Sequence, residues 1–250
     1  MLLALDIGNS TISAGIFDAE GFYKRYDFDH RQFDAGKFLS GLPKRKLSKI
    51  TRIVYSSVVP AIADKIKFQI KKELSLVPEN VEVFLKNNVE HKYKNVSQLG
   101  VDRLLVIKGA LEFYKTPFLV IDMGTAITVD YVNSLGVFEG GMIIPGVSVG
   151  LKALERETAL LPEINKLKKP NDLCGKNTKD CMLSGSVYGA ASMIDGLVRR
   201  FLKEKKCRAI NVVITGGISP LIAEFCEVKV VVDYDLALRT LFFISQRYFS

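Results

Sequence analysis

Short apolar runs alternate along this chain with longer stretches of helical period. Apolar runs of strand length predict β-strands at 2–5, 53–57, 81–85, 118–121, 210–214 and 228–232. Apolar residues recurring every three or four positions predict helices at 60–74, 103–114, 186–206 and 236–249. Pro60 suits the first helical position, where its missing N–H is not needed. Strands that alternate with helices indicate an α/β fold.

The apolar runs at 2–5 and 118–121 end in the same way. Asp6-Ile-Gly-Asn-Ser follows the first run, and Asp122-Met-Gly-Thr-Ala follows the second, 116 positions later. Strand-like segments come next in both places, at 11–17 and 22–28, joined by a turn at 19–21, and again at 127–132 and 136–144. This repetition predicts a duplicated α/β domain with halves 1–115 and 116–250.

Composition narrows the class of protein. Hydrophobic residues make up 48% and charged residues 25% of the 250 positions, as in folded proteins and unlike disordered chains or coiled coils. Four cysteines without a C-x-x-C pair, and only two histidines, indicate a reducing compartment and neither a disulfide scaffold nor a zinc site. No basic signal-peptide region and no apolar run of ~18 residues is found. We therefore expect a cytoplasmic protein without a membrane partner.

The chain is basic, with 35 Lys and Arg against 27 Asp and Glu, a formal net charge of +8. Its basic residues are spread over separate loops and predicted helix faces, at 44–46, 65–72, 166–169 and 199–206. This spread favours solvated faces over a nucleic-acid surface. We also expect His30 and His91 at the surface, and a mobile loop at 166–177.

The turn after the first strand carries candidate phosphate ligands. Neither G-x-x-x-x-G-K-[ST] nor G-x-G-x-x-G occurs in the chain. Gly8 allows close backbone approach to a phosphate, and the side chains of Asn9, Ser10, Thr11 and Ser13 supply donors. Asp6 would hold Mg²⁺ through water, because this ion prefers one or two carboxylates plus phosphate oxygens. The alternative is a plain hairpin turn with an Asx cap. The similar turn at 122–128 would grip the same triphosphate from the other half.

Three further segments carry candidate chemistry. In Gly100-Val-Asp102-Arg103, Asp102 is either a helix N-cap or a general base, and Arg103 could bind a carboxylate or phosphate through two hydrogen bonds. Thr215-Gly-Gly217 follows a predicted strand and would admit a flat group such as adenine, or would form an ordinary turn. The Gly- and Pro-defined segment 139–146 would shape the wall of a cleft.

Together these motifs resemble type III pantothenate kinases, members of the acetate kinase, sugar kinase, Hsp70 and actin superfamily. The resemblance rests on D-x-G-N-[ST] at 6–10, G-x-D-R at 100–103, D-x-G-T-A at 122–126, G-G-x-I-x-P-G at 140–146, T-A-L-L-P at 158–162, G-K-N-T at 175–178 and T-G-G at 215–217. The motifs cover nearly the whole chain. G-x-D-R and G-G-x-I-x-P-G are the most specific of them.

The resemblance implies two duplicated RNase H-like (actin-like ATPase) α/β domains with mixed sheets. It implies transfer of the ATP γ-phosphate to the primary hydroxyl of pantothenate, the first step of coenzyme A biosynthesis, with Asp102 as proton acceptor. The residues that it places against ATP are Asp6, Ile7, Gly8, Asn9, Ser10, Thr11, Ile12, Ser13 and Thr125. Those that it places against pantothenate are Tyr93, Gly100, Val101, Asp102, Arg103 and Thr178.

The resemblance also implies cofactors and an assembly. Mg²⁺ would accompany ATP, and Asp122 would bind a monovalent cation, K⁺ or NH₄⁺. The family forms homodimers with the site near the subunit interface, so Thr178 would serve the neighbouring subunit.

Two other functions remain open at this point. A sugar or acetate kinase of the same superfamily would keep both Asp-x-Gly turns but would not need Gly100–Arg103. A non-catalytic regulator would use the net charge of +8 to bind nucleic acid. Retention of Asp6, Asp102 and Asp122 argues against the regulator.

Overall fold

The structure is a computed structural model that describes residues 1–18, 21–30 and 33–248. Its contacts divide the chain into two compact units, one made of Met1–Glu112 and Leu236–Ser250, the other of Phe113–Asp235. Each unit is built on one five-stranded mixed sheet. The C-terminal helix groups with the first unit although it follows the second in sequence. Two domains divided after residue 115 remain a prediction.

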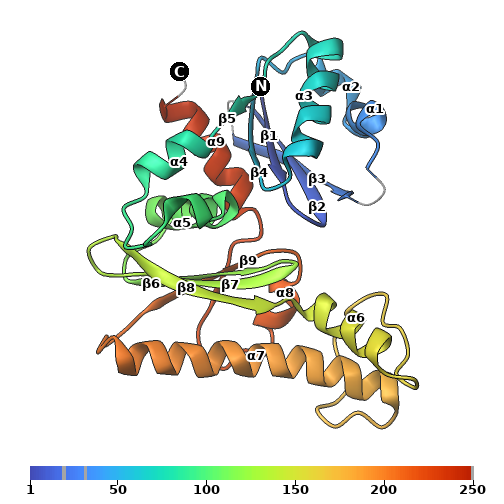
Figure 1. Cartoon of the computed structure of the whole chain (residues 1–250), viewed down its shortest axis with the longest axis vertical. Coiled ribbons are helices and arrows are strands. Elements are labelled where there is room, and N and C mark those ends of the chain that lie inside the picture. Colours follow the sequence, from blue (N-terminus) through green and yellow to red (C-terminus); the bar gives the residue numbers. More distant parts are fainter. Residues whose placement is uncertain (19–20, 31–32, 249–250) are drawn as a thin grey trace. The chain divides into compact units, whose positions relative to one another are not determined.

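The first unit has its strands in the order β3-β2-β1-β4-β5, with β1 antiparallel to β2 and parallel to β4 (Figure 1). The strands are β1 (Leu2–Ile7), β2 (Thr11–Asp18), β3 (Gly21–Asp29), β4 (Arg52–Ser57) and β5 (Glu79–Asn80). The α-helices are α1 (Ala35–Phe38), α2 (Lys44–Leu47), α3 (Pro60–Leu74), α4 (Glu82–Asn88), α5 (Val101–Phe113) and α9 (Leu236–Tyr248). The 3₁₀ turns η2 (Leu39–Gly41) and η3 (Val96–Gln98) also belong to it.

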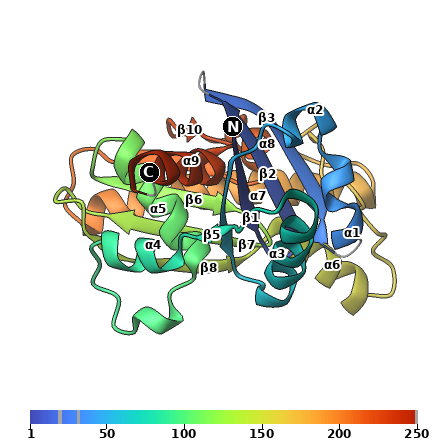
Figure 2. The ribbon, with the colours of Figure 1, turned by 90° about the horizontal axis from the view of Figure 1, so that it is seen from above.

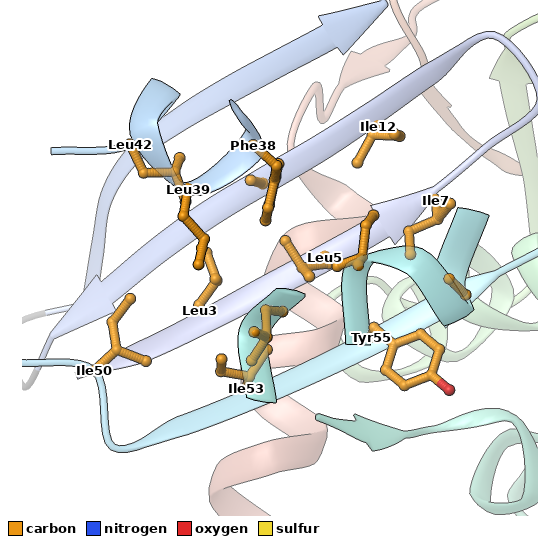
Figure 3. Close-up of a cluster of buried hydrophobic side chains, with 14 of the residues drawn as sticks. Leu3, Leu5, Ile7, Ile12, Phe38, Leu39, Leu42, Ile50, Ile53 and Tyr55 are labelled. Carbon is orange, nitrogen blue, oxygen red and sulfur yellow. The ribbon is translucent and has the colours of Figure 1, made fainter. Parts of the chain in front are cut away.

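The two faces of the first sheet have different partners. Side chains alternate along β1, so Leu3, Leu5 and Ile7 share one face, where Figure 3 shows them among apolar side chains that include Phe38 and Leu39. Helix α3 adds Ala63, Ile66 and Ile70 to this core. On the opposite face α9 packs against the sheet, with Phe242 stacked on Phe17 of β2 at 4.5 Å between ring centroids. Asp6 lies on this second face.

The second unit repeats the first strand for strand. Its sheet has the order β8-β7-β6-β9-β10, with β6 antiparallel to β7 and parallel to β9, so that β6 corresponds to β1. The strands are β6 (Phe118–Met123), β7 (Ala126–Val132), β8 (Phe138–Pro145), β9 (Asn211–Thr215) and β10 (Val231–Val232). The helices are α6 (Val147–Glu157), α7 (Thr178–Glu204) and α8 (Ser219–Ala223). This repetition confirms the predicted duplicated α/β fold with mixed sheets.

Helix α7 covers one face of the second sheet. Its residues Val187, Ala190, Ile194 and Val198 pack with Leu119 and neighbouring strand residues in one core. Figures 1 and 2 both show the helix running along this sheet. By length and composition α7 could cross a membrane, although its sequence has no unbroken apolar run of that length. Half of its most apolar 18-residue stretch is buried inside the protein. Packing on the sheet explains its apolar face.

The strand predicted at 81–85 is wrong. The register with β4 covers Glu79–Asn80 and ends with a 3.1 Å bond from the Val81 amide to the Tyr55 carbonyl, and α4 follows at once from Glu82. Val81 and Leu85, both buried, are four residues apart, which is the spacing of one helix face rather than of a strand. Asn80 also accepts a hydrogen bond from the Glu82 amide at 2.9 Å, a local signal for a helix start.

Other predicted elements differ mainly in their bounds. Helix α7 begins at Thr178, eight residues before the predicted start at 186. Polar residues in the first turns of α7 interrupt the apolar period from which the helix was predicted. The turn predicted at 19–21 falls largely on Ala19 and Glu20, outside the described residues.

Candidate functional site

Asp6 is the second-last residue of β1 and is flanked by two hydroxyls. It pairs in register with Ser13 of β2 and with Ser56 of β4, so the three side chains share the face of the sheet opposite the apolar core. Between Ile7 and Ile12 the chain turns through four residues, closed by a 3.0 Å bond from the Gly8 amide to the Thr11 carbonyl.

The predicted ATP residues 6–13 therefore lie in one hairpin, but not all their side chains are accessible. Ile7 and Ile12 are 1% and 0% exposed, so only their backbones can face a ligand. Asn9 and Thr11 lie at the turn, and both are exposed. The hairpin can offer amides and hydroxyls to an anion, as the sequence predicts.

Negative charge is concentrated around Asp6. Its pKa is raised to about 7, mainly by burial and then by the neighbouring carboxylates of Asp102 and Asp27, while Arg25 acts in the opposite direction. Asp102 stands in the first turn of α5. The fold thus brings together the first acidic turn and the G-x-D-R motif, 96 positions apart (102 − 6). A divalent cation would relieve this repulsion.

The Ser13 hydroxyl belongs to a network on the β2–β3 hairpin. It donates to Asp27 Oδ1 at 2.7 Å and accepts from Arg25 Nη2 at 2.8 Å. Arg25 Nε also contacts both oxygens of Asp27, at 2.8 and 2.9 Å. Ser13 is therefore held by protein groups, and Arg25 and Asp27 are members of this region that the sequence reasoning missed. Arg25 and Asp27 are two residues apart on β3, so the sequence predicts that they lie on the same face of the sheet, but it does not predict that this is the face of Asp6.

Asp102 and Arg103 are fixed by the start of α5. Asp102 Oδ1 accepts the Arg103 amide at 2.8 Å, and a Cβ on Gly100 would collide with the same oxygen. Glycine at this position leaves room for the carboxylate. Arg103 is only 6% exposed, and its guanidinium lies 5.6 Å from the ring centre of Tyr93. Three predicted substrate residues, Tyr93, Asp102 and Arg103, are thereby brought together; Val101 beside them is buried.

The second acidic turn gathers three motifs in the other unit. Asp122 pairs in register with Thr128 of β7 and Thr215 of β9, which repeats the hydroxyls around Asp6. A Cβ on Gly216, whose φ is +91°, would lie 2.5 Å from Asp122 Oδ1. Thr125 accepts the Gly146 amide at 3.1 Å, and a Cβ on Gly146 would strike the backbone of this turn. T-G-G and G-G-x-I-x-P-G therefore both pack on D-x-G-T-A.

Thr128 adds an oxygen for which the described residues supply no partner. Its Oγ1 is buried, and so is Oγ of Ser56, the hydroxyl beside Asp6 that likewise lacks a partner there. A buried unpaired hydroxyl is costly, and such groups are normally satisfied by water or an ion. Around Asp122 a carboxylate and a hydroxyl are the hard oxygen donors that suit an alkali cation.

The G-K-N-T motif starts α7. Asn177 caps the helix by accepting the Asp180 amide at 3.0 Å, and Thr178 follows as an exposed first residue. A groove of about 660 Å³ runs between α6 and α7, with a mainly apolar lining that includes Leu151, Leu154 and Met182.

Both histidines are only partly exposed. His30 is half-buried, and its Nδ1 lies 3.1 Å from the Gly8 carbonyl in the first turn. His91 is half-buried as well and accepts the Tyr93 amide at 3.1 Å. Both histidines therefore keep part of their surface exposed, and each also makes a contact that its polar neighbours in sequence did not reveal. Among the described residues no group of three His, Cys, Asp or Glu could hold a metal.

Known proteins are similar to this chain in sequence and in fold. A family model for type III pantothenate kinase matches residues 2–200. A type III pantothenate kinase of Agathobacter rectalis is 35% identical over 246 residues, covering 96% of this chain and 94% of that protein. One of Bacillus cytotoxicus is 31% identical over 254 residues, covering 99% and 96%. A solved structure from Campylobacter jejuni, of a protein assigned to the Baf family of transcriptional activators, has a TM-score of 0.57 at 20% identity, covering 98% of this chain and 97% of that one; this likeness concerns the fold alone.

Proposed function

The chain belongs to the type III pantothenate kinase family, and from this premise we propose which of its residues perform the transfer. It is an ATP-dependent phosphotransferase that moves the γ-phosphate of ATP to the primary hydroxyl of pantothenate, giving 4′-phosphopantothenate for coenzyme A biosynthesis. Catalysis of this reaction is mainly positioning and charge stabilisation. The roles below follow from that requirement.

Asp102 is the proposed proton acceptor. It is held by its own helix start and is close enough to Asp6 to shift the pKa of that carboxyl. This juxtaposition of a base with the phosphate turn is the observation that supports the role. As the hydroxyl attacks phosphorus, its proton would pass to the Asp102 carboxylate.

The proposed ATP contacts are residues 6–13 and Thr125. The first group supplies turn amides and hydroxyls, and Thr125 lies in the equivalent turn of the second unit. Mg²⁺ fits the acidic surroundings of Asp6, which would hold it through water. When bound, it would neutralise charge on the phosphates. Asp6 would orient it, and the amides of the turn would orient the phosphate oxygens.

The proposed pantothenate contacts are Tyr93, Gly100–Arg103 and Thr178. Arg103 is the natural partner of the substrate carboxylate, because a guanidinium binds carboxylates through two parallel hydrogen bonds. The Tyr93 ring at its side would limit its movement. Thr178, exposed at the start of α7, would complete the pocket of a neighbouring subunit.

The remaining proposals concern the assembly and its surroundings. The apolar groove between α6 and α7 would be covered by a second copy of the chain, giving a homodimer, because a mostly apolar groove whose lining includes the exposed Leu154 suits burial. The four free cysteines support a cytoplasmic location.

Replacing the base is the direct test of this mechanism. Asp102→Asn should lower kcat by ~10²–10⁴-fold while ATP still binds, because the amide keeps the size of the carboxylate but cannot take the proton. An assay of ADP release with pantothenate measures turnover, and calorimetry measures ATP binding. Asp64→Asn, on the exposed side of α3, is the matched control and should turn over normally. Near-normal turnover by Asp102→Asn would show that another group is the base.

The monovalent cation gives a second prediction. Asp122 and the unpaired Thr128 hydroxyl would hold K⁺ or NH₄⁺, so replacing K⁺ by Na⁺ should lower activity. Asp122→Asn should abolish the difference between the two salts, because the charged ligand is gone. Equal rates of the unaltered enzyme in both salts would refute this role of Asp122.

A further inference from the structure

His30 connects the end of β3 to the phosphate turn at two points. Its backbone amide donates to the Ser10 carbonyl at 2.9 Å, and its ring Nδ1 lies 3.1 Å from the Gly8 carbonyl. The side chain is half-buried rather than projecting into solvent. The backbone contact continues the register of β2 and β3 by one residue beyond Thr11 and Asp29, whereas the ring contact lies outside that register. The ring contact therefore adds to the pairing that the hairpin already provides.

The chemistry of the ring contact fixes its direction. A carbonyl oxygen can only accept a hydrogen bond, so Nδ1 must carry the proton and donate. An amide nitrogen on a side chain of the same length could replace this donor, whereas a side chain without a donor at the δ position could not. Asparagine has its amide nitrogen one bond from Cγ, at the place of Nδ1, and glutamine has it one bond further out.

The contact also sets the orientation of the next amide. A trans peptide unit is planar, and its C=O and N–H point in opposite directions. Since the Gly8 carbonyl is directed at His30, the N–H of Asn9 in the same peptide unit is directed away from it. A phosphate is attracted by amides and repelled by carbonyl oxygens, so a turn that binds phosphate needs this orientation.

We propose that His30 is a positioning residue of the nucleotide site, which holds the Gly8–Asn9 peptide so that the amide rather than the carbonyl faces the ATP phosphates. The inference rests on the proposed use of residues 6–13 in ATP binding. It gives a role to a histidine that the family resemblance does not assign. Without the ring donor, the peptide is free to rotate, and the oriented state is populated for only part of the time.

The test compares three replacements of His30 with a control. His30→Phe keeps a ring without a donor, His30→Gln keeps a polar side chain with its amide in the wrong place, and His30→Asn restores a donor at the δ position. Asn88→Ala removes another side-chain bond to a carbonyl, 2.9 Å long, on α4. For each protein we would measure KM for ATP and for pantothenate, kcat, the melting temperature, and the calorimetric affinity for ATP and adenosine.

His30→Phe and His30→Gln should each raise KM for ATP about three- to tenfold, the equivalent of one lost hydrogen bond. kcat and KM for pantothenate should change less than about twofold, because ground-state and transition-state phosphate contacts weaken together. Affinity for adenosine, which has no phosphate, should be unchanged. His30→Asn should restore the KM for ATP, and Asn88→Ala should leave it unaltered.

Three results would overturn the inference: an unchanged KM for ATP in folded His30→Gln, equal losses for ATP and adenosine, or failure of His30→Asn to restore binding. A lower melting temperature with unaltered ATP affinity would reduce His30 to a structural role. Failure of the proposed function is distinguishable, because calorimetry reads ATP binding without turnover. If the unaltered protein binds ATP but does not phosphorylate pantothenate, the kinase assignment fails while the His30 comparison still decides the inference.

Discussion

At the scale of single residues, Asp6 shows how function opposes stability. Its pKa lies near 7 in the folded chain, against an ordinary value of 3.8. Burial is the main cause, and the charges of Asp102 and Asp27 add to it. The folded state therefore binds a proton more tightly than the unfolded state between about pH 4 and 7. Stability accordingly falls as the pH rises through this range and levels off above it.

Removing the Asp6 charge should therefore stabilise the protein while inactivating it. Asp6→Asn should raise the free energy of unfolding at pH 8 by about 1–3 kcal/mol, a range that allows for solvent screening of a half-buried group. The gain should be small near pH 4, because Asp6 is protonated there in the folded chain and is then as neutral as the asparagine of the variant. Urea unfolding at the two pH values measures it.

The matched control for this prediction is Asp64→Asn, which removes an exposed carboxylate paired with Lys67. Its effect on unfolding should stay within about 1 kcal/mol, in the range of surface ion pairs, at both pH values. A loss of stability in Asp6→Asn at pH 8 would mean that the carboxylate is stabilised by its surroundings, contrary to the direction of its pKa.

At the scale of elements, α5 and α9 cross with little space between them. A Cβ on Gly109 of α5 would overlap the Thr240 hydroxyl of α9 and lie 2.9 Å from Leu236 Cδ1. Glycine here is a packing requirement, since it otherwise weakens a helix. This contact holds the C-terminal helix to the first unit, and it also supports α5, whose first turn carries Asp102.

Gly109→Ala should lower stability by about 1–3 kcal/mol, because an added methyl group overpacks the crossing. Gly196→Ala in α7 is the matched control: apart from its chain neighbours and its own helix backbone, no atom of the described residues lies within 4 Å of the new Cβ, so the better helix propensity should stabilise by up to about 1 kcal/mol. Thermal unfolding of both variants provides the comparison. Adding Thr240→Ala to Gly109→Ala should recover part of the loss; no recovery would mean that the crossing is not the cause.

At the scale of the whole molecule, one topology occurs twice. The turn after β1 has four residues and the turn after β6 has three, yet each strand-end aspartate keeps a hydroxyl-bearing residue in register on both sides. Duplication explains this correspondence, and the differences show how the halves have specialised. The first half adds Asp102 and Arg103, whereas the second adds the groove between α6 and α7.

Closure of that groove by a second copy predicts a solution dimer. Leu154→Glu would place a charge in the apolar groove, so sedimentation should show the unaltered chain at twice its monomer mass and the variant as a monomer. Val83→Glu on α4, where Val83 is 72% exposed, is the control and should leave the mass unchanged. A monomeric unaltered chain would contradict the proposed covering of the groove.

The sequence by itself determined the elements whose signal is local. Apolar period and turn residues predicted most strands and the four longest described helices, α3, α5, α7 and α9, but not the shorter ones. The repeated Asp-x-Gly turns predicted the duplication, because strand burial and glycine turns act over a few residues. Where the period was ambiguous, as at Val81 and Leu85, tertiary packing decided for a helix. The family motifs identified the proposed site residues, but not the hydrogen bonds and packing contacts that fix their side chains.

Only the tertiary structure decided which side chains meet. Apart from burial, the pKa of Asp6 is raised by the charges of Asp102 and Asp27 and lowered by that of Arg25, and none of these three residues is adjacent to Asp6 in the chain. The same holds for His30 on the Gly8 carbonyl. Hydrogen bonds and charges act over a few ångströms in space, and strand pairing brings distant segments within that range without leaving a local pattern in the sequence.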